Sequence, residues 1–154
     1  MTVINGLPAH ALLVHFVVVL VPLTALLEIV CGLWPAARRG QLLWLTLILA
    51  AGTMALTPIT INAGGWLYDQ TAKPSAVLQR HADLGSLMNY FAAALLAVAI
   101  ALVVFRVAER RFGKSHVIAN ILVAILVLAV GVSSIIQIYQ VGDAGAQAVW
   151  GGGK

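Results

Sequence analysis

The chain has 154 residues, of which 62% are hydrophobic and only 9% are charged. Soluble domains carry about 25% charged residues because their surfaces face water, so this composition excludes a soluble globular domain. The formal net charge is +4, but the basic residues lie in short clusters between apolar runs. That distribution is typical of membrane topology and does not favour nucleic-acid binding.

Four apolar stretches are long enough to cross a bilayer, since about 20 helical residues span the hydrocarbon core. Backbone polar groups in lipid must be paired within the segment, so the stretches are expected to be helices. The prediction is an all-α, integral membrane four-helix bundle in a single domain, residues 1–154. The expected helices span about residues 10–34, 41–61, 83–106 and 116–141. The expected outer loop is 62–82, and the expected mobile tail is 142–154.

Lysine and arginine predict the orientation, because cytoplasmic loops of membrane proteins carry an excess of them. Six basic residues lie in the first and third connections: Arg38, Arg39, Arg106, Arg110, Arg111 and Lys114. The opposite side has three: Lys73, Arg80 and Lys154. We therefore expect a bacterial cytoplasmic-membrane protein with both termini on the outer side (N-out/C-out).

Polar residues gather in the outer half of the predicted bundle. An ionisable residue in a membrane helix is a functional hypothesis by default, because its burial in lipid is costly. His10 lies at the outer end of the first helix, His15 about 7 Å deeper at about 1.5 Å per residue, and His81 just ahead of the third helix. The other helices bring further polar residues to this level: Thr57, Thr60, Asn89, Tyr90, Ser133, Ser134, Gln137 and Tyr139.

Two histidines of this outer group suit the ligation of one haem iron. His10 and His15 lie about 140° apart around a helix, so a ligand pair takes one of them together with His81. Gly85, one turn after His81, leaves space against the helix backbone for a flat ligand, as bis-histidine ligation of haem b requires. The candidate cofactor-binding residues are His10, His15, His81, Gly85, Asn89, Gln137 and Tyr139, with His15 and His81 the candidate metal ligands.

Structural explanations compete with this reading. His10 and His81 suit interfacial polar positions at helix ends, and Asn89 and Gln137 can form hydrogen bonds between helices. Glu28, near the cytoplasmic end, is expected to pair with Arg38 or else to extend its carboxyl to the membrane surface, with the pair favoured. Cys31, the single cysteine, is expected to be inert.

The sequence lacks a Walker loop, a dinucleotide-binding glycine fingerprint, an HExxH motif and a Cys-x-x-Cys motif, so an enzyme is not favoured. Three hypotheses remain. The protein is a haem-containing electron carrier near the outer face, or a non-catalytic accessory or scaffold subunit that joins other membrane subunits or a homo-oligomer, or a binding protein for a metal ion or quinone. Its expected partner in each case is the lipid bilayer, and none of the three involves nucleic acid.

Three segments resemble the membrane family called domain of unknown function 2231. Residues 6–16, Gly-Leu-Pro-Ala-His-Ala-Leu-Leu-Val-His-Phe, resemble its opening signature, His-Pro-Leu-x-Val-His-Phe-Pro. Arg80-His81 followed by Asn89 is similar to the family's entry to the third helix, and residues 139–150 resemble its terminal Tyr-x-x-Gly block. The resemblance implies a four-helix membrane fold and no particular activity.

The chain departs from that family pattern at three positions. Ala11 and Val17 replace prolines, and Val141 stands where many members carry a histidine before the glycine. The resemblance then implies that a cofactor in this chain would depend on His10, His15 or His81.

Overall fold

The computed structural model describes residues 3–4, 7–113 and 117–151. Two very short strands, which pair antiparallel, precede a bundle of four long helices. The elements in chain order are β1 (Val3–Ile4), β2 (Leu7–Pro8), α1 (Ala9–Leu33), α2 (Pro35–Arg38), α3 (Leu42–Asp69), α4 (Ala76–Phe112) and α5 (Val117–Trp150).

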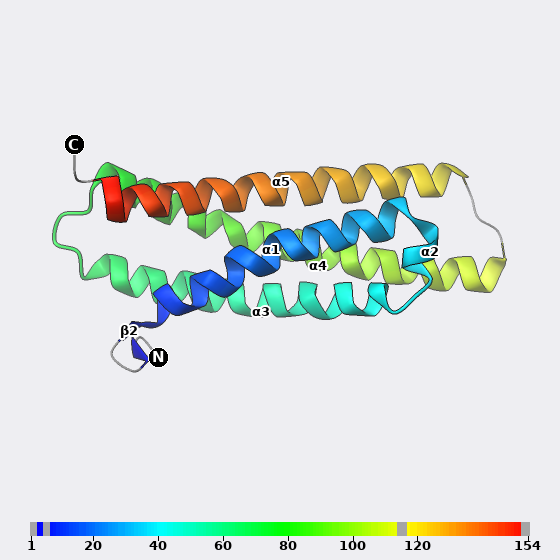
Figure 1. The fold of residues 1–154 in the computed structure, drawn as a ribbon, viewed down its shortest axis with the longest axis horizontal. Coiled ribbons are helices and arrows are strands. Elements are labelled where there is room, and N and C mark those ends of the chain that lie inside the picture. The colour runs from blue at the N-terminus through cyan, green and yellow to red at the C-terminus, as the bar shows by residue number, and fades with distance from the viewer. Residues whose placement is uncertain (1–2, 5–6, 114–116, 152–154) are drawn as a thin grey trace.

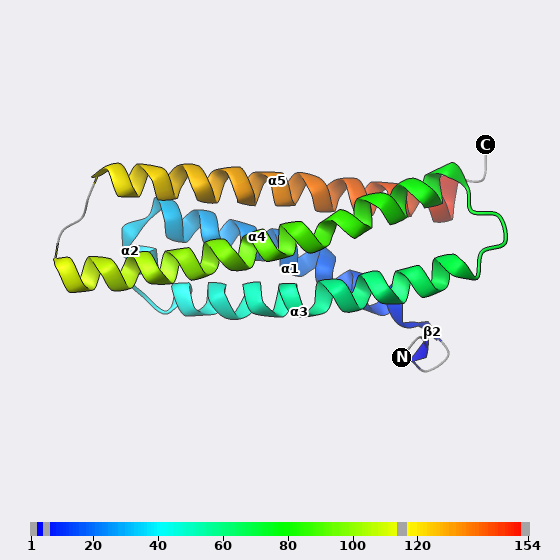
Figure 2. The same cartoon turned by 180° about the vertical axis from the view of Figure 1, so that it is seen from behind.

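The four long helices run alternately up and down, so the start of α1 and the end of α5 lie at the same end of the bundle (Figures 1 and 2). Helix α1 packs mainly against α3 and α5, and α4 packs against the same two helices, so α1 and α4 occupy diagonal corners. We call the end that holds the starts of α1 and α4 the histidine end, after His10 and His81. The opposite end, which holds α2, is the arginine end, after Arg38.

All four long helices have the length and the apolar composition needed to cross a membrane. Large apolar side chains cover the outside of the bundle, as the high exposure of Ile48, Val104 and Leu122 illustrates. Several threonines are instead buried inside it. Apolar outside and partly polar inside is the arrangement that a lipid solvent selects, so the predicted four-helix membrane fold is confirmed.

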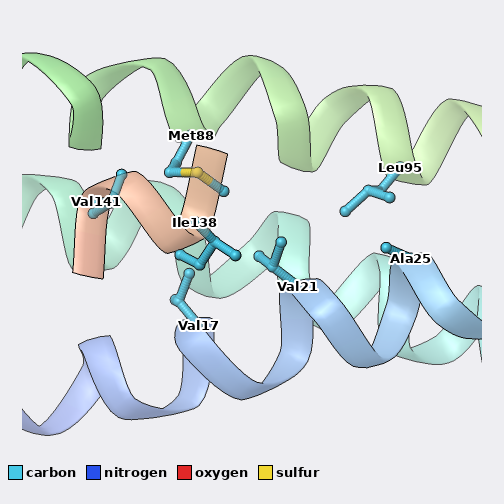
Figure 3. Close-up of a cluster of buried hydrophobic side chains, with 7 residues drawn as sticks. All are labelled: Val17, Val21, Ala25, Met88, Leu95, Ile138 and Val141. Atoms are coloured by element: carbon cyan, nitrogen blue, oxygen red, sulfur yellow. The ribbon is translucent and has the colours of Figure 1, made fainter. Parts of the chain in front are cut away.

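The apolar interior forms two clusters, one toward each end. The cluster nearer the histidine end joins α1, α4 and α5 (Figure 3) and contains Val17, Val21, Ala25, Met88, Leu95, Ile138 and Val141. The cluster nearer the arginine end contains Cys31, Leu43, Val98, Leu102 and Val127. Together they fix the relative positions of the helices that carry the polar groups described below.

The helices are longer than the sequence suggested. Helix α3 continues through Gly64 to Asp69, so the predicted outer loop 62–82 reduces to a connection over residues 70–75. Ser75 then caps α4 by accepting a hydrogen bond from the backbone N–H of Leu78 at 3.2 Å. At about 1.5 Å per residue the 37 residues of α4 measure about 55 Å, so this helix projects well beyond a hydrocarbon core of about 30 Å.

The predicted tail 142–154 is also helical through Trp150. Ile138, Val141 and Ala144 lie on one side of α5 and are all buried against the bundle. Because that packed side continues past Val141, the helix continues with it. The expected start of this helix at residue 116 falls outside the described residues.

Candidate functional site

The rings of His10 and His81 meet at the histidine end of the bundle. Their centroids are 6.1 Å apart and their planes are inclined by 79°. His10 comes from the first turn of α1 and His81 from the second turn of α4, so the pair links two diagonal helices. Of the two α1 histidines, His10 and not His15 is thus the one whose ring lies beside His81.

Each of the two rings is held by a backbone carbonyl of a third or fourth helix. The Nδ1 atom of His10 lies 2.9 Å from the carbonyl oxygen of Thr60 in α3. The Nδ1 atom of His81 lies 3.0 Å from the carbonyl oxygen of Val141 in α5. A carbonyl oxygen only accepts, so each neutral ring carries its proton on Nδ1 and leaves the Nε2 lone pair free.

Two glycines, Gly64 and Gly145, leave the space that the rings of His10 and His81 occupy. A Cβ atom on Gly64 would lie 2.8 Å from both Cε1 and Nδ1 of His10. A Cβ atom on Gly145 would lie 2.9 Å from Cε1 and 3.1 Å from Nδ1 of His81. Each ring therefore rests directly against the backbone of the helix whose carbonyl it uses, which fixes its orientation.

The neighbouring candidates have different surroundings. Gly85, one turn from His81 on α4, borders open space, since a Cβ there would meet nothing within 4 Å. Asn89 follows one turn later, and its Oδ1 atom is buried without a hydrogen-bond partner in the described part of the chain. Gln137 of α5 is buried, and its Nε2 atom donates to the carbonyl oxygen of Leu84 at 2.9 Å, which ties α5 to α4.

His15 and Tyr139 lie away from the ring pair. Tyr139 is 72% exposed on the outside of α5. His15 is also exposed, contacts the carbonyl oxygen of Ala11 in its own helix, and borders a shallow apolar groove of about 340 Å³. Both side chains point toward the position of lipid or solvent, so the structure does not bring them to His10 and His81.

Across the residues described, no group of three or more His, Cys, Asp or Glu side chains could hold a metal ion. The histidine end thus brings together two histidine side chains, with no third His, Cys, Asp or Glu that would complete a metal-binding group among the described residues. A bare ion such as Zn²⁺ takes four ligands, whereas haem iron has four nitrogens of its own and would take only one or two further ligands from the protein.

The arginine end contains a buried polar network that the sequence did not reveal. The Arg38 side chain is fully buried; its Nη2 atom lies 3.0 Å from Oε1 of Glu109 and 2.7 Å from Oδ1 of Asn120. Its Nη1 atom donates to the carbonyl oxygens of Cys31 and Gly32, at the end of α1. The guanidinium also lies 4.7 Å from the ring centre of Phe105.

The expected pair between Glu28 and Arg38 is wrong. Arg38 instead forms an ion pair with Glu109. Both carboxyl oxygens of Glu28 are buried with no hydrogen-bond partner among the described residues. Helical side chains lean toward the N-terminus of their helix, so the carboxyl of Glu28 leans away from Arg38, which bonds the last turn of α1.

Sequence reasoning also missed the two glycines that seat the rings. Gly64 lies in the segment predicted as the outer loop, 62–82, and Gly145 in the segment predicted as the tail, 142–154. Glycine is unfavourable inside a helix by about 1 kcal/mol relative to alanine, so a glycine at the level of a histidine on another helix is the signal that could have indicated close packing.

The fold and the ring pair define a four-helix integral membrane protein with a two-histidine site at one end. The chain belongs to the family described as predicted membrane protein DUF2231, whose model matches residues 6–153. No curated protein and no solved structure matches the chain.

Proposed function

We propose that this protein binds one haem b at the histidine end, with His10 and His81 as axial ligands, and carries single electrons. The observation that supports this most directly is the ring separation of 6.1 Å. A histidine nitrogen lies about 2 Å from its metal and about 1 Å from its own ring centre, so two imidazoles on opposite sides of one metal have centres about 6 Å apart. A tetrahedral metal would bring the centres to about 5 Å.

The hydrogen bonds of the rings support the same proposal. Histidines that bind a metal donate their other ring N–H to a carbonyl or carboxylate, which fixes the tautomer and raises the basicity of the ligand nitrogen. Both His10 and His81 do this through Nδ1, toward Thr60 and Val141.

Two features of α4 near His81 support a flat cofactor. Gly85 leaves its side of α4 uncovered, so a macrocycle would meet backbone rather than a side chain there. The unpartnered Oδ1 atom of Asn89, one turn further, supplies a buried acceptor for a polar group such as a protonated propionate. Haem bound in this way supplies reversible one-electron chemistry at the iron.

The distribution of basic residues supports a location of this site on the side of the membrane away from the cytoplasm. The arginine end carries Arg38 and Arg39 beside α2 and Arg110 and Arg111 in the last turn of α4. Under the positive-inside rule that end is cytoplasmic, and the protein would exchange electrons near the outer surface.

The experiment is an absorption spectrum of protein purified after expression with added haem precursor. We expect reduced-minus-oxidised bands of a six-coordinate low-spin haem b at about one haem per chain. The bands should be lost in His10→Ala and His81→Ala and kept in His15→Ala, the matched control on the same helix. A colourless wild type, or bands that depend on His15 and not on His10, would overturn the proposal.

The near-perpendicular rings give the proposal a second readout. With planes inclined by 79°, axial imidazoles should produce a strongly anisotropic low-spin EPR signal in the oxidised protein. A rhombic signal typical of parallel imidazole planes would contradict the ligand pair.

A further inference from the structure

Glu28 is fully buried in α1, at 0% exposure. It stands between the two apolar clusters, three residues from Ala25 of one and three residues from Cys31 of the other. Both of its carboxyl oxygens lack a hydrogen-bond partner in the described ranges. An unpaired carboxylate in such surroundings costs several kcal/mol, and the group binds a cation or a proton instead.

The polar groups one turn to either side of Glu28 indicate whether a hydrogen-bond donor is available to its carboxyl. Toward the histidine end, Thr24 Oγ1 lies 3.2 Å from Thr53 Oγ1. The hydroxyl of Thr53 already donates to the carbonyl oxygen of Leu49 at 2.8 Å. Thr24 is therefore the donor in the pair, and its own hydrogen is also committed.

Toward the arginine end, the thiol of Cys31 and the hydroxyl of Thr46 are engaged in the same way. Cys31 Sγ lies 3.7 Å from Thr46 Oγ1, and the hydroxyl of Thr46 donates to the carbonyl oxygen of Leu42 at 2.8 Å. The thiol of Cys31 is thus the donor to Thr46. The hydroxyl and thiol hydrogens of the buried residues one turn to either side of Glu28, on α1 and α3, are therefore all used in other hydrogen bonds. None of them is left to donate to the Glu28 carboxyl.

The charged groups nearest along the chain do not supply a counter-charge. Arg38 in α2 is paired with Glu109 of α4 and bonds the carbonyl oxygens of Cys31 and Gly32. Cys31 is the titratable neighbour on α1 itself. The buried residues of the other helices near this depth are not ionisable: Ala50 and Thr53 of α3, Leu95, Val98 and Ala99 of α4, and Val127 and Gly131 of α5.

We propose that Glu28 is an intramembrane proton-binding site: the carboxyl is held as the neutral acid at neutral pH and exchanges its proton with water. The buried carboxyl has no hydrogen-bond donor and no counter-charge among the described residues, so the neutral acid is favoured over the carboxylate. Protonation of Glu28 does not depend on haem binding.

Infrared spectroscopy of the purified protein tests the protonation directly. Ordinary carboxyls are ionised at neutral pH, so the C=O stretch of a protonated carboxyl should be present in the wild type and missing in Glu28→Gln. It should persist in Asp83→Asn, which removes an exposed carboxyl of α4. Transfer to D₂O should shift the band, because the proton exchanges.

Three results would overturn the proposal. The first is a wild type without a protonated-carboxyl band at neutral pH. The second is a band that does not shift after prolonged incubation in D₂O, which would leave a buried acid with no exchange. The third is a band that disappears on addition of NaCl at constant pH, which would make the site one for a sodium ion. Glutamine copies the shape of the neutral acid, so Glu28→Gln should fold and melt close to the wild type; a large loss of stability would also count against a neutral carboxyl.

Discussion

The guanidinium of Arg38 lies 3.0 Å from the carboxylate of Glu109, although the side chain of Arg38 is fully buried and that of Glu109 is 6% exposed. This ion pair joins the short helix α2 to the last turns of α4, and Asn120 extends it to α5. It therefore joins α2, α4 and α5 at the arginine end of the bundle.

Removal of one partner should be strongly destabilising. Glu109→Ala leaves a buried guanidinium without its counter-charge, which typically costs about 3–5 kcal/mol. Thermal unfolding in mild detergent should show a large drop in Tm. The control is Arg39→Ala, which changes the adjacent exposed arginine and should leave Tm close to the wild-type value; equal losses in the two variants would contradict the role of the pair.

The glycine that seats His81 should be intolerant of a methyl group. In Gly145→Ala the new Cβ lies 2.9 Å from Cε1 of His81, so the ring must move, at about 1–3 kcal/mol for such overpacking. Gly142→Ala, on the same helix, meets nothing within 4 Å and should be neutral or slightly stabilising, because alanine is the better helix former. Unfolding curves of the two variants, compared in one detergent, give the measurement.

A parallel comparison is available on α3. Gly64→Ala should displace His10 from its contact with Thr60, whereas Gly65→Ala meets open space. If haem is bound as proposed, only the first of these two variants should weaken or alter the haem spectrum. An equal change of the haem spectrum in Gly65→Ala would contradict the proposed ligand pair.

The close approach of α1 and α5 at Gly32 gives a prediction about packing alone. A Cβ on Gly32 would lie 2.8 Å from Cγ1 of Val127, so Gly32→Ala should destabilise the bundle by about 1–3 kcal/mol. Val127→Ala removes the atoms in conflict. The double variant should be more stable than the sum of the two single changes predicts, and a double-mutant cycle measures that coupling; simple additivity would refute the contact.

The orientation can be checked with single cysteines in the Cys31→Ser background, which removes the buried native thiol. Thr71→Cys, in the connection between α3 and α4, should react with an impermeant maleimide in intact cells. Arg111→Cys, in the last turn of α4, should react only after the membrane is opened. The reverse pattern would place the histidine end in the cytoplasm.

The sequence by itself determined the solvent of this protein and the number of its helices. Four apolar stretches with few charges cannot remain in water, and backbone hydrogen bonding then requires helices. It also placed His10 and His81 at the same end, because depth follows from residue spacing along a helix. The helix ends were predicted too short, since glycines near 64 and 145 look like terminators when the packing around them is unknown.

Only the tertiary structure decided which side chains meet. Rotation of each helix about its own axis is set by packing between helices, and an apolar stretch with little amphipathic pattern carries almost no information about it. That rotation places His10 beside His81 and pairs Arg38 with Glu109. It also leaves the carboxyl of Glu28 without a hydrogen-bond partner among the described residues. The histidine pair with its two carbonyl acceptors and two glycines is thus a property of how the four helices pack, since its parts come from all four of them.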